Sequence, residues 1–470
     1  MVAVPFPTSS GKGKYAESGG RLINAYAEKL PDGRIVLRRA PGIEEIAELL
    51  TSSNCRGAIE INGVLLAAVT DRLVTITRAG SVYTLTDIGS FPGSRTVYFA
   101  RNNKSPTPDI VAVTNSSAFV IDLTDGASPY PDSDVGSPNS VTFQGGYFVF
   151  SYGNARMRAS GLNTTAINTL DTAFAESKPD GLYRVIGLGR NIYAFGPYTI
   201  EIWVNSGNAT GFPFSYLDTI PRGLAGPDAV AGQENGWSNA LILVGDDGVV
   251  YQISGDGLKP VSNASVAGDV EALEDKGSLS ACVYAHRGHA IWALSCDDWT
   301  WCFDLSTGEW FERASHGSDR WRVTATVKCF DRWVACDGLT GKFGFIDADE
   351  HYEFGEVLTA VVISATMSGF PLRAIISRLV LDIMAGVGKA AGIDPIATNP
   401  RCIISFSKDG GVVFVGGATR EVGQQGKYKR VVSVNRVGLV STKGLQVRVE
   451  FSDPVPFSLF GGDVQVAQAA

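Results

Sequence analysis

The feature that most constrains the fold is a short pattern that recurs seven times between about residue 56 and residue 358. In each copy an apolar strand, a tight turn and a second apolar strand are followed by a polar loop rich in Gly, Asp and Ser. The strands are rich in Val, Ile, Phe, Tyr and Trp, which favour buried β-structure. The turns are short and mostly contain Gly, Asn or Asp, as β-hairpin turns do. The copies are centred on residues 63–76, 109–123, 141–152, 184–204, 240–253, 282–305 and 327–347.

The copies lie roughly 37 to 50 residues apart, which is the spacing of the four-stranded blades of a β-propeller. A single blade cannot bury both of its faces, whereas blades stacked around an axis bury each other's. No long segment of helical period separates the copies, which argues against a parallel sheet with crossover helices. The sequence therefore predicts an all-β chain with a six- or seven-bladed β-propeller at residues 56–356. Residues 21–43 are expected either to close the ring with a strand or to form a clamp outside it.

The pattern changes after residue 354, where the strands become longer and alternate between apolar and polar side chains. Alternation of this kind is typical of antiparallel sheets with one buried face. We therefore expect an antiparallel β-sandwich of about six strands at residues 357–470, packed beside the propeller. Residues 1–55 are expected to form an N-terminal arm.

The composition argues against a nucleic-acid-binding protein, a membrane-spanning protein and a small disulfide-rich protein. The net charge is −8 with a pI near 5.2, and no basic run resembles a nucleic-acid-binding surface. No apolar segment is long enough to span a membrane, and the first residues lack the apolar core of a signal peptide. The seven cysteines show no spacing typical of a small disulfide framework, so we expect them to be reduced and mostly buried, as in a protein made in a cytoplasm.

One stretch, AHRGHAIWALSCDDWTWC at residues 285–302, suggests a metal site because it holds two histidines and two cysteines. A structural zinc ion needs four ligands that converge on one point. His286 and His289 flank a predicted hairpin turn and are close enough to share an ion, whereas Cys296 follows the second strand and Cys302 lies within the third. Because the four side chains are not expected to converge, we predict no metal ion and no cofactor.

Two adjacent copies of the pattern hold most of the tryptophans, namely Trp292, Trp299, Trp301, Trp310, Trp321 and Trp333. Large aromatic rings either pack between blades or form a flat platform for sugars. We favour packing and keep a glycan-binding propeller as an alternative.

Catalytic patterns are weak throughout the chain. Glycosidases need two carboxylates that flank a cleft, but Asp297-Asp298, Asp246-Asp247 and Glu44-Glu45 are sequence neighbours whose side chains point apart. The glycines of residues 187–191 fit a hairpin better than a dinucleotide site, because no helix follows them. We predict that the chain is not an enzyme, although a depolymerase that acts during host attachment remains an alternative.

One region resembles a known family. The segment KPDGLYRVIGLGRNIYAFGPYTIEIWV and the following GLAGPDAV are similar to the tail-hub family of short-tailed bacteriophages, also called nozzle or packaged-DNA stabilisation proteins. Weaker similarity covers NAYAEKLPDGRIVLRRAPGI near the N-terminus and the last strands near the C-terminus. The matching residues are Pro179, Asp180, Gly181, Thr199, Ile200, Glu201, Trp203, Gly223, Leu224, Ala225 and Gly226.

The resemblance implies a structural role in the virion tail, after synthesis in the host cytoplasm. It implies a ring of identical subunits, six in number, that lies below the portal and its adaptor ring and carries tail fibres, spikes or a needle. DNA passes through such a ring without sequence-specific binding and is retained in the particle until ejection. We expect the residues that line the channel to be acidic or neutral, because cations attract phosphates and slow the passage of DNA.

Overall fold

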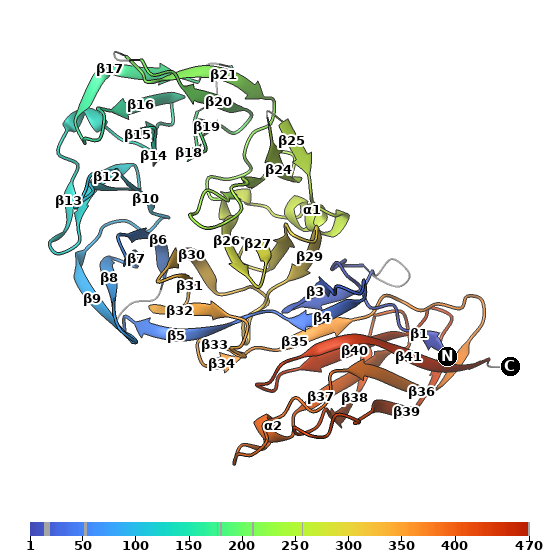
Figure 1. Ribbon diagram of the computed structural model, residues 1–470. Helices are drawn as coiled ribbons and strands as arrows, with labels where there is room; N and C mark the ends of the chain where they lie inside the picture. Colours follow the sequence, from blue (N-terminus) through green and yellow to red (C-terminus); the bar gives the residue numbers. More distant parts are fainter. Residues whose placement is uncertain are drawn as a thin grey trace.

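Seven antiparallel units of four strands surround a common centre and form most of the molecule (Figure 1). The computed structural model describes residues 1–13, 19–50, 54–175, 177–178, 181–208, 211–255 and 257–468. Each of the seven sequence copies falls in a different unit, which we number as blades 1 to 7 in chain order. The predicted all-β propeller is therefore confirmed, and it has seven blades.

The first four blades are consecutive in the chain, and each runs from an inner to an outer strand. Blade 1 consists of β6 (Cys55–Ile61), β7 (Val64–Val69), β8 (Arg72–Ala79) and β9 (Val82–Ser90). Blade 2 consists of β10 (Tyr98–Arg101), β11 (Ile110–Thr114), β12 (Ser117–Asp122) and β13 (Gly126–Pro129). Blade 3 consists of β14 (Ser140–Gln144), β15 (Tyr147–Ser151), β16 (Arg156–Ser160) and β17 (Ile167–Phe174). Blade 4 consists of β18 (Arg184–Leu188), β19 (Asn191–Phe195), β20 (Ile200–Asn205) and β21 (Phe214–Ile220).

The last three blades complete the circle. Blade 5 consists of β22 (Val230–Ala231), β23 (Ile242–Val244), β24 (Val250–Ser254) and β25 (Gly257–Pro260). Blade 6 consists of β26 (Ser280–His286), β27 (His289–Ser295), β28 (Thr300–Asp304) and β29 (Glu309–Glu312). Blade 7 consists of β30 (Val323–Cys329), β31 (Arg332–Asp337), β32 (Lys342–Asp347) and the N-terminal strand β5 (Gly42–Glu48).

The ring is closed by β5, which pairs antiparallel with β32 as the outermost strand of blade 7. The predicted closing segment, residues 21–43, overlaps this strand only at Gly42 and Ile43, so the prediction placed the closure too early in the chain. Pro41 explains the offset, because proline lacks the N–H that a ladder requires and separates β4 (Ile35–Arg39) from β5. The earlier part of the predicted segment pairs outside the ring.

Two further antiparallel sheets lie beside the propeller, at the lower right of Figure 1. In one, β3 (Ala25–Lys29), β4, β41 (Ser458–Gln468), β36 (Ala374–Ile383) and β39 (Val432–Val440) are neighbours in that order, and β1 (Val2–Ala3) also pairs with β41. The other continues blade 6 through β2 (Arg21–Ile23), β35 (Ala360–Ile363), β40 (Gln446–Phe451), β37 (Arg401–Ser407) and β38 (Phe414–Glu421). The small strands β33 (Tyr352–Glu353) and β34 (Glu356–Val357) extend blade 7.

Apolar side chains of these two sheets, such as Leu379, Val434, Ile404 and Val449, belong to one buried cluster. The same cluster includes inner residues of blades 4 to 7, so the propeller and the two sheets share a continuous core. In β36 and β39, buried residues recur at every second or third position, so each strand has one face toward this core.

Helices are short and few within the described ranges. They are α1 (Ala264–Glu271), α2 (Pro395–Thr398) and the 3-10 turns η2 (Ser133–Val135) and η3 (Lys276–Ser278). The sequence did not predict α1, which buries only Val266 and Val270 and begins where the Asn263 side chain accepts hydrogen bonds from two backbone N–H groups. No helix in this part of the chain is long and apolar enough to cross a membrane.

Candidate functional site

The histidine pair of blade 6 lies at a hairpin turn, as the sequence predicts. Arg287 and Gly288 form the turn with φ values of 44° and 86°, and His286 and His289 are direct partners across the two strands. Among the residues that the structure describes, no group of three or more His, Cys, Asp or Glu side chains is arranged to hold a metal ion. The pair therefore requires another explanation.

Both histidines pack against β3 of the neighbouring sheet. The Tyr26 ring meets His286 and His289 edge-on, with centroid distances of 5.2 and 4.9 Å. His289 Nδ1 lies 2.6 Å from a carboxylate oxygen of Asp304, whereas neither ring nitrogen of His286 has a hydrogen-bond partner within the described chain. Burial, followed by the nearby His289 and Arg313, lowers the pKa of His286 to about 3. His286 is therefore a neutral packing group between the propeller and β3.

The tryptophans of blades 6 and 7 are mostly inside the molecule. Trp292, Trp301, Trp310 and Trp321 are almost fully buried, and only Trp299 is partly exposed among the six. Trp310 meets the rings of Trp292 and Trp301 edge-on at 6.4 and 6.3 Å. A sugar platform needs exposed ring faces, so this cluster is packing and the geometry gives no support to a glycan site there.

A buried ion pair connects blade 6 to the chain segment that follows blade 7. The guanidinium of Arg313 lies 3.2 Å from Glu353 Oε1, and both side chains are almost completely buried. Glu353 also accepts hydrogen bonds from Trp321 Nε1 at 2.6 Å and from the Ser315 hydroxyl. Arg313 donates a further hydrogen bond to the carbonyl of Pro41, just before the ring-closing strand. These contacts fix the closure of the ring.

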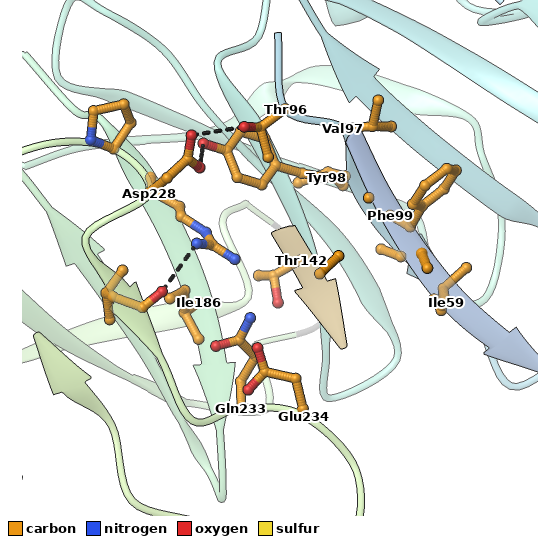
Figure 2. A pocket seen from close by; sticks show the side chains of 18 of the residues that line it. Ile59, Thr96, Val97, Tyr98, Phe99, Thr142, Ile186, Asp228, Gln233 and Glu234 are labelled. Carbon is orange, nitrogen blue, oxygen red and sulfur yellow. Dashed lines mark hydrogen bonds between the residues drawn. The ribbon is translucent and has the colours of Figure 1, made fainter. Parts of the chain in front are cut away.

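The propeller has a central cavity of about 1220 Å³ lined by the inner strands of the blades. Figure 2 shows Asp228, which precedes β22, facing Thr96 and Tyr98 of blade 2. The Tyr98 hydroxyl donates to one oxygen of Asp228 at 2.6 Å, and the Thr96 hydroxyl donates to the other at 2.7 Å. Burial and the charge of Asp228 raise the pKa of Tyr98 well above its usual value. These bonds connect non-adjacent blades across the cavity.

Charged groups around this cavity are balanced and largely satisfied by the protein itself. Arg184 lies over the Tyr98 ring and donates to the carbonyl of Val230. Arg56 donates to backbone carbonyls that include Phe91. Burial raises the pKa of Glu234, although the N–H of Gly232 donates to its carboxylate. Polar contacts around the cavity thus connect the blades and stabilise the ring. No local sequence motif predicted the residues that line it.

Nine of the residues that carry the family resemblance are described, and they lie just before, in and after blade 4; Pro179 and Asp180 fall outside the described residues. Ile200, Glu201 and Trp203 are buried in β20, and Thr199 precedes them. Glu201 accepts hydrogen bonds from the backbone of Ser177 and from Trp203 Nε1, at 2.8 and 3.0 Å. Gly181 lies where the chain enters the blade, close to the backbone of Gly153.

The remaining motif residues join blades 4 and 5. The N–H of Leu224 donates to the carbonyl of Gly196 in blade 4, and the N–H of Ala225 donates to Val244 in blade 5. A Cβ atom on Gly223 would lie 2.0 Å from the Pro197 carbonyl oxygen, and one on Gly226 would lie 2.6 Å from that of Lys276. The two glycines are therefore required by close backbone contacts, and the motif performs a structural task.

Comparison of this chain with known proteins identifies a matching protein family. A family model described as "Bacteriophage P22 Gp10, beta-propeller" matches residues 8–351, which contain all seven blades. Among solved structures, the chain is similar to the WD40 β-propeller domain of Doa1, with 11% identity, a TM-score of 0.41, and coverage of 65% of this chain and 96% of that one. It is likewise similar to the RRP9 WD40 repeats, with 11% identity, a TM-score of 0.42, and coverage of 66% and 99%. No curated protein matches the chain.

The family match extends over most of the chain and includes the segment on which the resemblance rests. It confirms the predicted membership in the phage packaged-DNA stabilisation family. The protein therefore belongs to the family of the bacteriophage P22 Gp10 β-propeller.

Proposed function

We propose that this chain is the tail hub, or nozzle, of a bacteriophage virion. In this role identical subunits, six in number, form a ring below the portal and adaptor, extend the DNA channel, retain the packaged genome and anchor fibres, spikes or a needle. The observation that carries the proposal is the family match over residues 8–351. The role is structural and needs no catalytic site.

The geometry of the central cavity favours a DNA channel between subunits over a channel through a single propeller. Hydrogen bonds from Thr96 and Tyr98 to Asp228 cross the cavity, and the loop that carries Glu234 also lines it. A DNA duplex cannot pass through a space bridged in this way, because blade packing would have to break. The proposed channel therefore runs along the axis of the assembled ring.

Removal of the protein from the particle tests this function. A phage whose copy of this reading frame carries a stop codon is expected to produce particles that package DNA and then lose it. The same phage grown in a suppressor host is the matched control, and purified protein added to the defective particles should restore retention. Particles that retain DNA and infect without the protein would contradict the proposal.

A further inference from the structure

The charge of this chain is divided unevenly between its two parts. Residues 357–470 contain twelve Lys and Arg against seven Asp and Glu, although the whole chain has a net charge of −8. The preceding 356 residues therefore carry a marked excess of acid. Such asymmetry favours contact between the acidic part of one molecule and the basic part of another.

Four of these twelve cations lie at or beside one end of the sheet formed by β36 and β39. This basic end comprises Arg373, Ile375, Arg378, Lys408, Arg436 and Leu439. Ile375 and Leu439 are cross-strand partners, with side chains 42% and 50% exposed. A hollow of about 290 Å³ is lined by Arg373, Lys408, Leu439 and two hydroxyl residues. Within the described chain, the side chains of Arg373 and Arg378 form no hydrogen bond or ion pair.

A face of opposite character lies on the rim of the propeller at blade 3. This acidic face comprises Asp132, Asp134, Leu170, Asp171 and Phe174. Its strand β17 contacts η2, and the N–H of Ile167 donates to Asp132 at 2.8 Å, so η2 lies beside the start of this outer strand. Leu170 and Phe174 are 80% and 47% exposed. No ion pair involves these three carboxylates among the described residues.

Within the described residues, the cations nearest this face form no ion pair with its carboxylates. No Lys or Arg occurs between Lys104 and Arg156. The Arg156 guanidinium stacks on Tyr152, and Arg158 is buried with a hydrogen bond to the backbone carbonyl of Asp134. Lys178 is exposed but lies beyond the end of β17.

We propose that the basic end of one subunit docks on the acidic face of the next subunit in the ring. Each surface combines exposed apolar side chains with charges of one sign, and the two signs are opposite. The surfaces cannot meet within one chain. Figure 1 shows β13 and β17 at the upper left of the propeller, whereas Ala374 pairs with Gln468 beside the C-terminus at the far right. Contact between different surfaces of identical chains is heterologous and repeats from subunit to subunit.

This inference rests on the ring assembly proposed above, and charge reversal tests it on the full-length protein. The variant Arg373→Glu/Arg378→Glu makes the basic end acidic, and Asp134→Lys/Asp171→Lys makes the acidic face basic. We expect each to raise the concentration for half-assembly by about tenfold or more, because like charges then face each other. Since every subunit carries both surfaces, the combined fourfold variant should assemble again, at a concentration close to that of the wild type.

The control variant is Arg78→Glu/Lys259→Glu, which makes the same change in net charge on exposed parts of blades 1 and 5 and should assemble as the wild type does. Mass photometry measures assembly, and circular dichroism checks folding. A carbodiimide, which joins amines to carboxylates in contact, should link Lys408 of one wild-type subunit to the acidic face of another; this readout needs no variant.

The outcomes separate the two proposals. Rings that persist in both reversed variants, with no such cross-link in the wild type, would overturn the docking of these surfaces and leave the tail-hub proposal intact. Loss of DNA binding by the Arg373→Glu/Arg378→Glu variant with unchanged assembly would assign the basic end to nucleic acid instead. A wild-type protein that stays monomeric at every concentration would overturn the ring itself.

Discussion

At the scale of single residues, burial determines what His286 does. Its ring is neutral because burial disfavours the charged imidazole and holds the pKa at about 3. In the unfolded chain the pKa is near 6.5, so the unfolded state binds a proton first as the pH falls. The contribution of His286 to stability is therefore complete above pH 6.5 and is lost between pH 6.5 and about 3, by at most roughly 4 to 5 kcal/mol.

The variant His286→Phe tests this linkage. Phenylalanine keeps a flat ring against Tyr26 and removes the two unpartnered nitrogens, so the variant should melt at a similar or higher temperature at pH 7. Its melting temperature should fall less than that of the wild type between pH 6.5 and 4. Melting curves at several pH values measure the difference; identical pH profiles for the two proteins would show that His286 does not titrate as described.

The buried pair Arg313–Glu353 is the second residue-scale determinant. Removal of one partner leaves the other charge buried and uncompensated, so Arg313→Met should destabilise the protein by about 3 to 5 kcal/mol. Adding Glu353→Gln should recover part of the loss. The matched control is Arg320→Met, whose partner Asp297 is exposed and whose loss should cost about 1 kcal/mol or less. Equal falls in melting temperature for the two arginine variants would contradict this account.

At the scale of elements, β5 determines whether the ring closes. A Cβ atom on Gly42 would lie 2.4 Å from the carbonyl oxygen of Tyr352 and 2.6 Å from that of Glu350. Gly42→Ala should therefore displace β5 and lower the stability by about 1 to 3 kcal/mol. The same substitution at Gly268 of α1, where nothing lies within 4 Å, should be neutral or stabilising. Thermal melting together with limited proteolysis after residue 48 measures the effect; a Gly42→Ala protein as stable as the Gly268→Ala protein would contradict it.

The inner strands of the blades can be predicted from the sequence pattern much better than the outer strands. Inner hairpins such as β7–β8 are continuous apolar runs, and their pattern marked a hairpin in each blade and predicted a propeller of six or seven blades. Outer strands such as β9 and β17 are mostly exposed and polar, so they carry little periodic signal. The pairing of β5 with β32 joins segments almost 300 residues apart, and no local pattern specifies such a pairing. The sequence did not predict a role for Asp228 for the same reason, because its hydrogen-bond partners Thr96 and Tyr98 lie in another blade.

At the scale of the whole molecule, the N-terminal part of the chain holds the structure together. Its strand β2 joins the sheet of blade 6, and β5 completes blade 7. Its strands β1, β3 and β4 join the sheet that contains β36, β39 and β41. The Arg39 guanidinium donates to the carbonyls of Phe451 and Asp453, and burial lowers its pKa to about 10. Shared strands and a shared core between the propeller and the adjoining sheets make a rigid unit, which is compatible with the tail-hub role proposed above.

The central claim is that this chain forms the ring through which DNA leaves the virion. Cryo-electron microscopy of the intact phage tail tests it most directly. We predict density for a seven-bladed propeller with two adjoining sheets, repeated six times around the tail axis below the portal and adaptor, with the DNA path between the copies. Density for this chain only at a fibre tip, or its absence from the mature particle, would contradict the claim.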